Sequence, residues 1–182
     1  MDNKFEELLI LNKKMAAFSK EWWYEEVVFT FPWWVVLVTL ILPWLLWWKF
    51  VDRRRIKEIS IIGFFIMITS YLLDQMGASL SLWTYKVTPT PLAREVFDPA
   101  DLAILPVFYM LIYQYFSSWK NYIIAQIGLA LFAAYIGGNL FQWLGIYLII
   151  NWKHIYSVPI YILLGLVAKL LVHGLNALEK SN

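Results

Sequence analysis

The chain alternates between long apolar stretches and short polar connections from Phe31 to Val172. About five of these stretches approach the ~20 residues that a helix needs to cross a bilayer. The stretches lie near residues 32–50, 59–76, 101–117, 121–139 and 156–172. Trp, Tyr, Lys and Arg, which prefer the membrane–water boundary, gather at their ends. The pattern predicts an all-α fold in which residues 31–176 form a polytopic bundle of transmembrane helices.

The segment before the bundle, residues 1–30, has a different pattern. Apolar side chains recur at spacings of three and four, which places them on one face of a helix. These residues are Leu8, Leu11, Met15, Phe18 and Trp22. We expect an amphipathic helix over residues 3–26 that lies in the plane of the membrane interface. A helix that is exposed to solvent or docked on a partner has the same pattern. Residues 177–182 form a short C-terminal tail.

The segment 121–150 is too long for one upright span and too short for two. Thirty helical residues cover ~45 Å, whereas the hydrocarbon core is ~30 Å thick. Because Gly137, Gly138 and Asn139 offer a break, we expect the fourth span to end near Asn139. Residues 141–152 would then lie along the interface or re-enter the membrane.

The distribution of Lys and Arg predicts the orientation, since short cytoplasmic loops carry an excess of both. Eight basic residues fall on one side of the predicted spans: Lys49, Arg53, Arg54, Arg55, Lys57, Lys120, Lys169 and Lys180. The opposite connections contain three: Lys86, Arg94 and Lys153. We therefore expect the N-terminus outside the cell and the C-terminus in the cytoplasm.

Composition narrows the classes of function. The chain is 61% hydrophobic and 15% charged, and its net charge of +2 is too small to indicate a nucleic-acid partner. It contains no cysteine, which excludes disulfides, thiolate metal ligands and a cysteine nucleophile. His154 and His173 fall on opposite membrane faces and cannot share a metal ion. We therefore expect no metal ion, no cofactor and no nucleic acid.

Several short strings occur together in a characteristic order. They are PWLLWWK at 43–49, VDRR at 51–54, LW-T-Y at 82–85, DLAILPV at 101–107, YMLIYQYF at 109–116, WK at 119–120, LGIY at 144–147 and YSVPIY at 156–161. With these strings, residues 40–172 resemble an uncharacterised family of small multi-pass membrane proteins of spore-forming Firmicutes. The resemblance implies a bacterial plasma-membrane or spore-membrane location. It transfers no catalytic residue.

Ionisable side chains within membrane spans are costly and usually face a protein interior or a water-filled cavity. Asp74 is one such residue, although a hydrated position at headgroup depth or a cap on the following loop would also explain it. Asp98 and Asp101 fit the start of a helix, with Asp at the N-cap, Pro at the first position and Asp at the third. The predicted topology brings eight side chains to an outward-facing vestibule that could bind a ligand: Asp74, Trp83, Tyr85, Arg94, Asp101, Asn139, Gln142 and His154.

Three further polar residues fall within spans and have expected structural roles. Gln114 and Gln126 should form hydrogen bonds between helices, the usual role of an amide in a membrane. Lys169, near the inner end of the last span, should extend its side chain to the headgroups.

These features leave three functions open. The preferred one is a non-catalytic protein that binds a lipid, a small solute or a membrane-protein partner through the vestibule, because no known catalytic arrangement is present. The second is an intramembrane enzyme that acts on a lipid or isoprenoid. Its support is a faint similarity between Trp83, Tyr85 and the Asp98–Asp101 run and the membrane lycopene cyclases. The third is a small transporter or channel that forms as a homo-oligomer.

Overall fold

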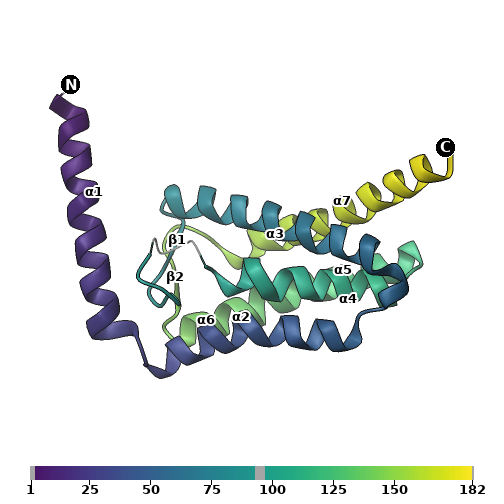
Figure 1. The fold of residues 1–182 in the computed structure, drawn as a ribbon, viewed down its shortest axis with the longest axis horizontal. Helices are drawn as coiled ribbons and strands as arrows, with labels where there is room; N and C mark the ends of the chain where they lie inside the picture. The colour runs from purple at the N-terminus through teal and green to yellow at the C-terminus, as the bar shows by residue number, and fades with distance from the viewer. Residues whose placement is uncertain (1–2, 93–96, 182) are drawn as a thin grey trace.

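The computed structural model describes residues 3–92 and 97–181 of the chain and is almost entirely helical (Figure 1). The elements in chain order are α1 (Asn3–Trp22), η1 (Trp23–Val27), α2 (Phe31–Phe50), η2 (Arg53–Arg55), α3 (Ile56–Ser79), β1 (Trp83–Tyr85), η3 (Ala100–Ile104), α4 (Leu105–Tyr115), α5 (Trp119–Leu131), η4 (Phe132–Gly137), α6 (Gly138–Trp143), β2 (Tyr147–Ile149) and α7 (His154–Ser181). The predicted all-α fold is confirmed.

Four helical rods in the described part of the chain are long and apolar enough to cross a membrane. They cover Phe31–Phe50, Arg53–Ser79, Trp119–Trp143 and His154–Glu179. The fifth rod, Ala100–Tyr115, is apolar but shorter. Its length of ~24 Å, at 1.5 Å per residue, falls short of the ~30 Å hydrocarbon core. The expected five spans therefore correspond to four long helices and one short one.

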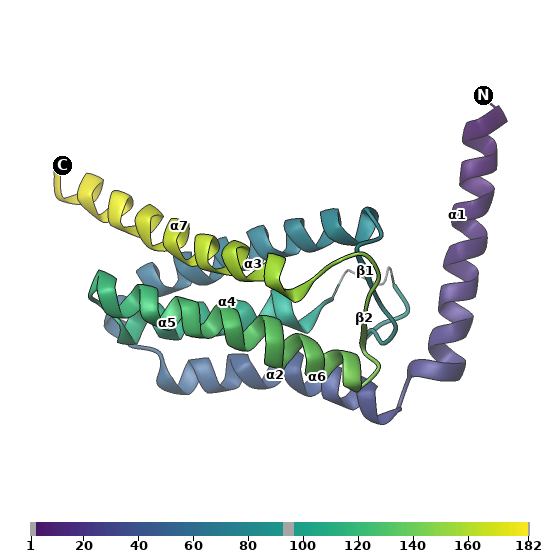
Figure 2. The same ribbon diagram turned by 180° about the vertical axis from the view of Figure 1, so that it is seen from behind.

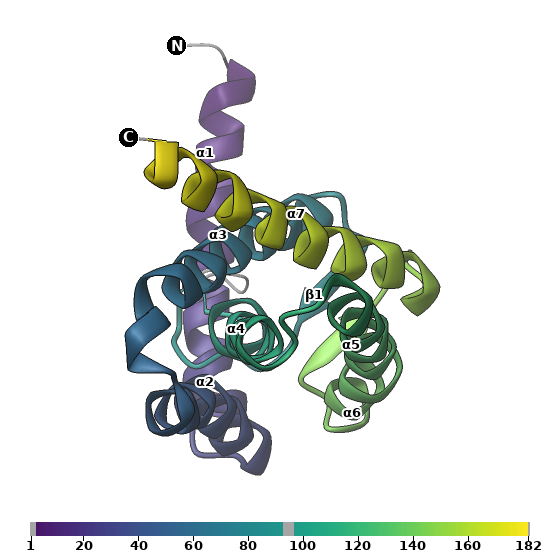
Figure 3. The ribbon, with the colours of Figure 1, turned by 90° about the vertical axis from the view of Figure 1, so that its right-hand side faces the viewer.

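The short helix α4 lies at the centre of the bundle, with α2, α3, α5 and α7 around it (Figure 3). One face of α4 is buried among these neighbours and includes Tyr109 and Met110, which are 0% and 1% exposed. The Tyr109 hydroxyl donates a hydrogen bond of 2.6 Å to the backbone oxygen of Tyr161 in α7. Because protein surrounds much of α4, it need not match the full thickness of the bilayer.

The long rod α5–η4–α6 corrects one prediction. The helix continues through Gly137 and Gly138, which both have helical backbone angles, so the break expected near Asn139 is wrong. The helix ends after Trp143, where Gly145 has φ +69°. The amides of Gly145 and Ile146 donate to the oxygens of Gln142 and Phe141, at 2.9 Å each. This pattern closes the last helical turn and requires a left-handed residue, which only Gly adopts readily.

Residues 141–152 also differ from the prediction, because they do not form a separate interfacial or re-entrant helix. After the turn at Gly145 the chain extends as β2, which pairs antiparallel with β1. The register places Tyr85 opposite Tyr147 and Thr84 opposite Leu148. The pair crosses one end of the bundle and joins the α3–η3 connection to the α6–α7 connection (Figure 2).

The N-terminal helix α1 forms as predicted but stands apart from the bundle, at a steep angle to the other helices (Figure 1). None of its residues is buried. The turn that follows is attached, because the Trp23 indole donates to the backbone oxygen of Thr88 at 2.9 Å. Trp33, at the start of α2, likewise donates to the oxygen of Pro89 at 3.2 Å.

Two of the three expectations for polar residues within the spans need correction. Gln114 behaves as expected, since its amide accepts from the Asp52 nitrogen and donates to the Phe50 oxygen, at 2.9 Å each. Gln126, by contrast, is 0% exposed, and its amide atoms have no hydrogen-bond partner among the described residues.

Lys169 does not extend to the headgroups. It is 2% exposed, and its ammonium group donates to the backbone oxygens of Phe116 and Ser117, at 3.3 and 2.8 Å. These two carbonyls directly follow α4, where the negative end of the helix dipole favours a cation.

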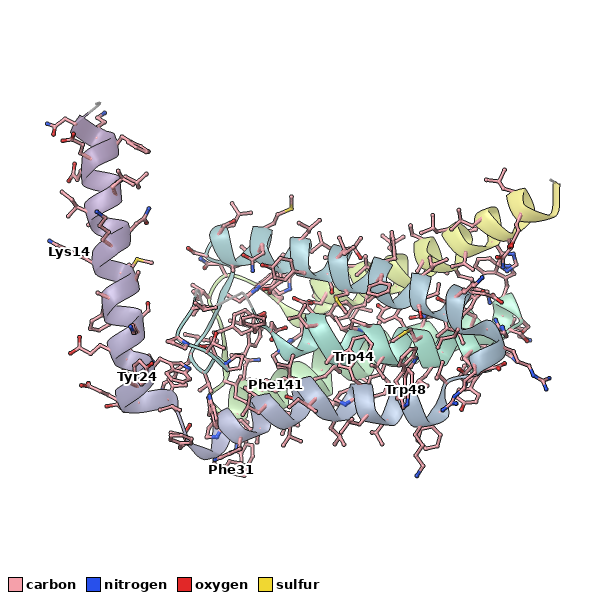
Figure 4. All side chains as sticks on the ribbon, in the orientation of Figure 1. Lys14, Tyr24, Phe31, Trp44, Trp48 and Phe141 are labelled. Carbon is pink, nitrogen blue, oxygen red and sulfur yellow. The ribbon has the colours of Figure 1, made fainter. Side chains whose placement is uncertain are left out.

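Large apolar side chains cover the outside of the bundle, in keeping with a bilayer as its solvent. Trp48 points away from the bundle, whereas Trp44 on the same helix turns inward (Figure 4) and donates to the backbone oxygen of Leu102 at 3.0 Å. Exposed residues of this kind occur on every long helix. Such a surface would be unstable in water, and it supports a membrane location.

Candidate functional site

The polar groups with the most unusual surroundings gather at the end of the bundle that carries the two strands. Asp74 lies near the C-terminal end of α3 and is 7% exposed. Its Oδ1 accepts hydrogen bonds from the Trp83 indole at 2.7 Å and from the Tyr85 hydroxyl at 2.5 Å. Both donors belong to β1, so this carboxylate ties the strand to the helix. Simple hydration therefore does not explain Asp74, whereas the other simple explanation, a cap on the following loop, fits these two contacts.

A glycine makes this contact possible. A Cβ atom at Gly77 would collide with the indole ring of Trp83. Because Gly77 has no side chain, the ring can lie against the backbone of α3 and direct its N–H to Asp74. The position three residues after Asp74 is thus part of the site, although it carries no chemistry of its own.

Asp98 caps the helical rod that begins at η3, as the sequence predicts. Its Oδ2 accepts from the backbone nitrogen of Asp101 at 3.2 Å, and its backbone oxygen accepts from Leu102 at 3.1 Å. Asp101 does not act in the same way. It is 6% exposed, and its Oδ2 has no hydrogen-bond partner in the described residues. Capping therefore explains Asp98 but does not account for the buried Oδ2 of Asp101.

Burial and nearby negative charges raise the pKa values of two groups at this end of the site, Asp98 and Tyr85. Burial, followed by the charge of Asp74, raises the pKa of Asp98 from 3.8 to about 7, against the backbone N–H groups that favour its ionised form. The pKa of the Tyr85 hydroxyl also rises, because of burial first and then the charges of Asp98, Asp74 and Asp101. Near neutral pH, Asp98 can therefore gain or lose a proton.

A cavity of about 280 Å³ opens beside these carboxyl groups. Asp74, Asp98 and Asp101 line its acidic end. Tyr and Trp side chains surround that end: Trp83, Tyr85, Tyr147, Trp152 and Tyr161. Elsewhere the walls are apolar and come from α4, α5, η4 and α6. The lining also includes Thr39, so the cavity extends from the sheet to α2.

The structure brings together five of the eight predicted vestibule residues as cavity lining: Asp74, Trp83, Tyr85, Asp101 and His154. Gln142 contacts His154, with 3.0 Å between Nε2 and Nε2, but lines a separate and more open depression. Asn139 is exposed and donates to the backbone oxygen of Tyr135 at 2.6 Å. Arg94 lies outside the described residues.

Sequence reasoning missed Tyr147 and, on α7, Ser157 and Tyr161, which lie beside the predicted His154. His154, Ser157 and Tyr161 all line the cavity. Their spacing of three and then four residues is a signal that they share a helix face. Tyr147 is identified only by the pairing of β2 with β1, which places its ring 5.5 Å from that of Tyr85. Nothing in a three-residue strand predicts such a partner.

Within residues 3–92 and 97–181, no group of three or more His, Asp or Glu side chains is arranged to hold a metal ion. The site is therefore described by its carboxyl groups, its aromatic rings and its apolar walls. No family model, no curated protein and no solved structure matches this chain. The geometry and lining of the cavity are therefore the basis of the function proposed below.

Proposed function

We propose that this protein binds an amphiphilic molecule of the bilayer, which enters the cavity sideways from the lipid. The observation that carries the proposal is the graded lining. One end is acidic and rich in hydroxyl and indole groups, whereas the other includes apolar side chains exposed on the surface of the bundle. These are Phe108, Phe132, Ile136 and Leu140, which are 41, 50, 56 and 51% exposed. A polar head and an apolar chain would each find a matching wall.

Filling the cavity tests this proposal. Ala133 lines the cavity on η4, and we expect Ala133→Phe to reduce the amount of co-purifying amphiphile at least fivefold, because the ring would occupy the space. The matched control is Ile124→Phe, which changes a 59% exposed position on α5 outside the cavity lining. Mass spectrometry of protein extracted in mild detergent gives the ratio of bound molecule to protein. Equal ratios in wild type and Ala133→Phe, with both folded, would contradict the proposal.

A second function, an enzyme that protonates a lipid or isoprenoid, is favoured by one observation. The Asp98 carboxyl lines the cavity, and its pKa of about 7 lets it carry a proton near neutral pH. The same mass spectra discriminate between the two. A bound molecule that is chemically altered with wild type and unaltered with Asp98→Asn would favour the enzyme.

We further propose that the cavity faces away from the cytoplasm. The described basic residues support this orientation, since Lys49, Arg53–Arg55, Lys57, Lys120 and Lys169 belong to the end of the bundle opposite the sheet. Only Lys86 and Lys153 among the described Lys and Arg residues of the bundle belong to the sheet end. The positive-inside rule then places the sheet outside.

The absence of cysteine permits a direct test of the orientation. A membrane-impermeant maleimide added to intact cells should label Lys153→Cys, which is exposed at the sheet end, at least fivefold more than Ser117→Cys, which is exposed at the other end. Labelling of the same two variants after cell lysis gives the maximum yield at each cysteine, to which the yield in intact cells is compared. The reverse ratio in intact cells would place the cavity on the cytoplasmic side.

In this orientation, α1 would lie flat on the outer surface. Its steep angle to the bundle supports that arrangement (Figure 1), because transmembrane helices run close to the membrane normal, with an average tilt of ~20°. Lys14 and the other charged side chains project along its length (Figure 4), so one face can remain in water while the apolar face enters the lipid. Membership of the Firmicutes family and a spore-membrane location stay predictions.

A further inference from the structure

The identity of the polar head can be inferred from Asp101, and the inference rests on the function proposed above. Asp101 lines the cavity and is 6% exposed, and its Oδ2 has no hydrogen-bond partner among residues 3–92 and 97–181. Leaving a buried carboxylate oxygen unsatisfied is costly. Asp98 already caps the helix, so the buried and unsatisfied oxygen of Asp101 is not needed as a cap. A bound group that complements the carboxylate would remove this cost.

The rings around Asp101 favour a cation as that group. Trp83 and Trp152 lie with ring centroids 5.3 Å apart and planes at 75°, and Tyr85 and Tyr147 lie 5.5 Å apart. All four rings line the same end of the cavity as Asp98 and Asp101. Aromatic faces attract ammonium groups, especially where water is excluded. Carboxylates and rings in one pocket are thus suited to an organic cation and unsuited to an anion.

No side chain of the described part of the chain supplies that cation. Among residues 3–92 and 97–181, neither a Lys nor an Arg lines the cavity. Lys86 and Lys153, at this end of the bundle, are exposed. A metal ion is a poor alternative, since the described residues offer no arrangement of ligands for one.

We propose that the acidic end of the cavity binds the ammonium head group of an amphiphile, with Asp101 as its principal counter-ion and the Trp and Tyr rings around it. The cavity volume of about 280 Å³ is at the lower limit of typical small-molecule sites, ~300–1,000 Å³. It accommodates a trimethylammonium group and a short chain. A longer chain would leave past Phe132 and Leu140 into the lipid.

Binding should be coupled to proton release. The titratable groups that line the cavity with Asp98 are Asp74 on α3, Tyr85 on β1, Asp101 on η3, Tyr147 on β2, and His154 and Tyr161 on α7. Burial and the charge of Asp74 raise the pKa of Asp98 to about 7, so the empty site retains a proton in mildly acidic solution. A cation favours the ionised carboxyl. Its affinity should therefore increase as the pH rises from 5.5 to 8.

The test uses three probes of similar length: hexyltrimethylammonium, heptanoate and 1-heptanol. Each is titrated calorimetrically into phosphatidylglycerol nanodiscs that contain the full-length protein, and titrations into empty nanodiscs are subtracted. We expect wild type to bind the ammonium probe at least tenfold more tightly than the other two. Asp101→Asn, which preserves volume, should lose this preference, whereas Asp52→Asn, at the other end of the bundle, should retain it. Thermal unfolding of each variant verifies that it is folded.

The possible results distinguish a failure of the cationic head group from a failure of the amphiphile-binding function on which it rests. Equal binding of all three probes, reduced by Ala133→Phe, would overturn the cationic head group and retain the amphiphile site. A folded Asp101→Asn that keeps the tenfold preference would overturn the role of Asp101. Adding phosphatidylethanolamine to the nanodiscs distinguishes the source of the ammonium group. If a bilayer lipid is the natural occupant, the amine lipid competes and weakens the binding of the probe; a free organic cation predicts no change.

Discussion

Gly165→Leu should lower the free energy of unfolding by about 3 kcal/mol, at the upper end of what overpacking a core costs. Gly165 is a buried position of α7 at its contact with α5. A Cβ atom there would lie 2.5 Å from the side-chain amide carbon of Gln126, which is itself fully buried. The backbone oxygen of Gly165 also accepts a hydrogen bond of 2.7 Å from the Tyr122 hydroxyl. A side chain would force the two helices apart and weaken both contacts.

Gly174→Leu is the matched control, because it makes the same change on the same helix where nothing lies within 4 Å of the added Cβ. It should be neutral or stabilising by up to ~1 kcal/mol, since Leu favours a helix more than Gly does. Reversible unfolding of both variants in mixed micelles, followed by circular dichroism, measures the difference. Similar stabilities for the two variants would show that α5 and α7 do not pack as described.

Asp74→Leu should also destabilise the fold, by about 2–4 kcal/mol. The substitution removes the acceptor of two hydrogen bonds and leaves the Trp83 N–H and the Tyr85 hydroxyl without it. Hydrogen bonds to a charged group contribute ~1.5–3 kcal/mol, and each buried group that loses its partner costs ~1–3 kcal/mol. These losses overlap, so their sum overstates the effect. Because β1 is tied to α3 through this carboxylate, amide hydrogen exchange at Tyr85 should accelerate in the same variant.

Asp74→Asn distinguishes the contribution of the two hydrogen bonds to stability from that of the negative charge. Its side-chain oxygen can still accept from both donors, so most of the stability and the slow exchange of Tyr85 should be retained. Unfolding and exchange measurements on the two variants, under the same conditions as wild type, give the comparison. If Leu and Asn at this position have equal effects, the hydrogen bonds to Trp83 and Tyr85 do not hold the strand in place.

The helices could be predicted from the sequence because their signals are local. Apolar length alone located α2, α3 and α7, and Asp98 followed by Pro99 located the start of η3 and the residue that caps it. The end of α6 could not be predicted in this way. Gly137, Gly138 and Gly145 are equally able to end a helix, and the backbone angles that distinguish them depend on the packing of the rod against its neighbours.

The site was only partly predictable, for the same reason. Asp74 stood out as a charge in an apolar span, and Asp101 as the third residue of a helix-start motif. The cavity that they share depends on Ala133 and Phe132, which read in the sequence as ordinary parts of an apolar helix. Lys169 was misplaced because the sequence does not show that the α4 carbonyls end beside it.

The two short strands have a consequence for where the sheet end of the molecule can lie in a bilayer. The amides of Lys86 and Val87 donate to the oxygen of Ile146, and those of Ile150 and Asn151 donate to the oxygen of Leu82. The two connections between helices thus form many of their backbone hydrogen bonds with each other and need fewer water molecules as partners. This end of the protein can therefore rest among the lipid ester groups, where water is scarce, without an energetic penalty for exposed peptide groups.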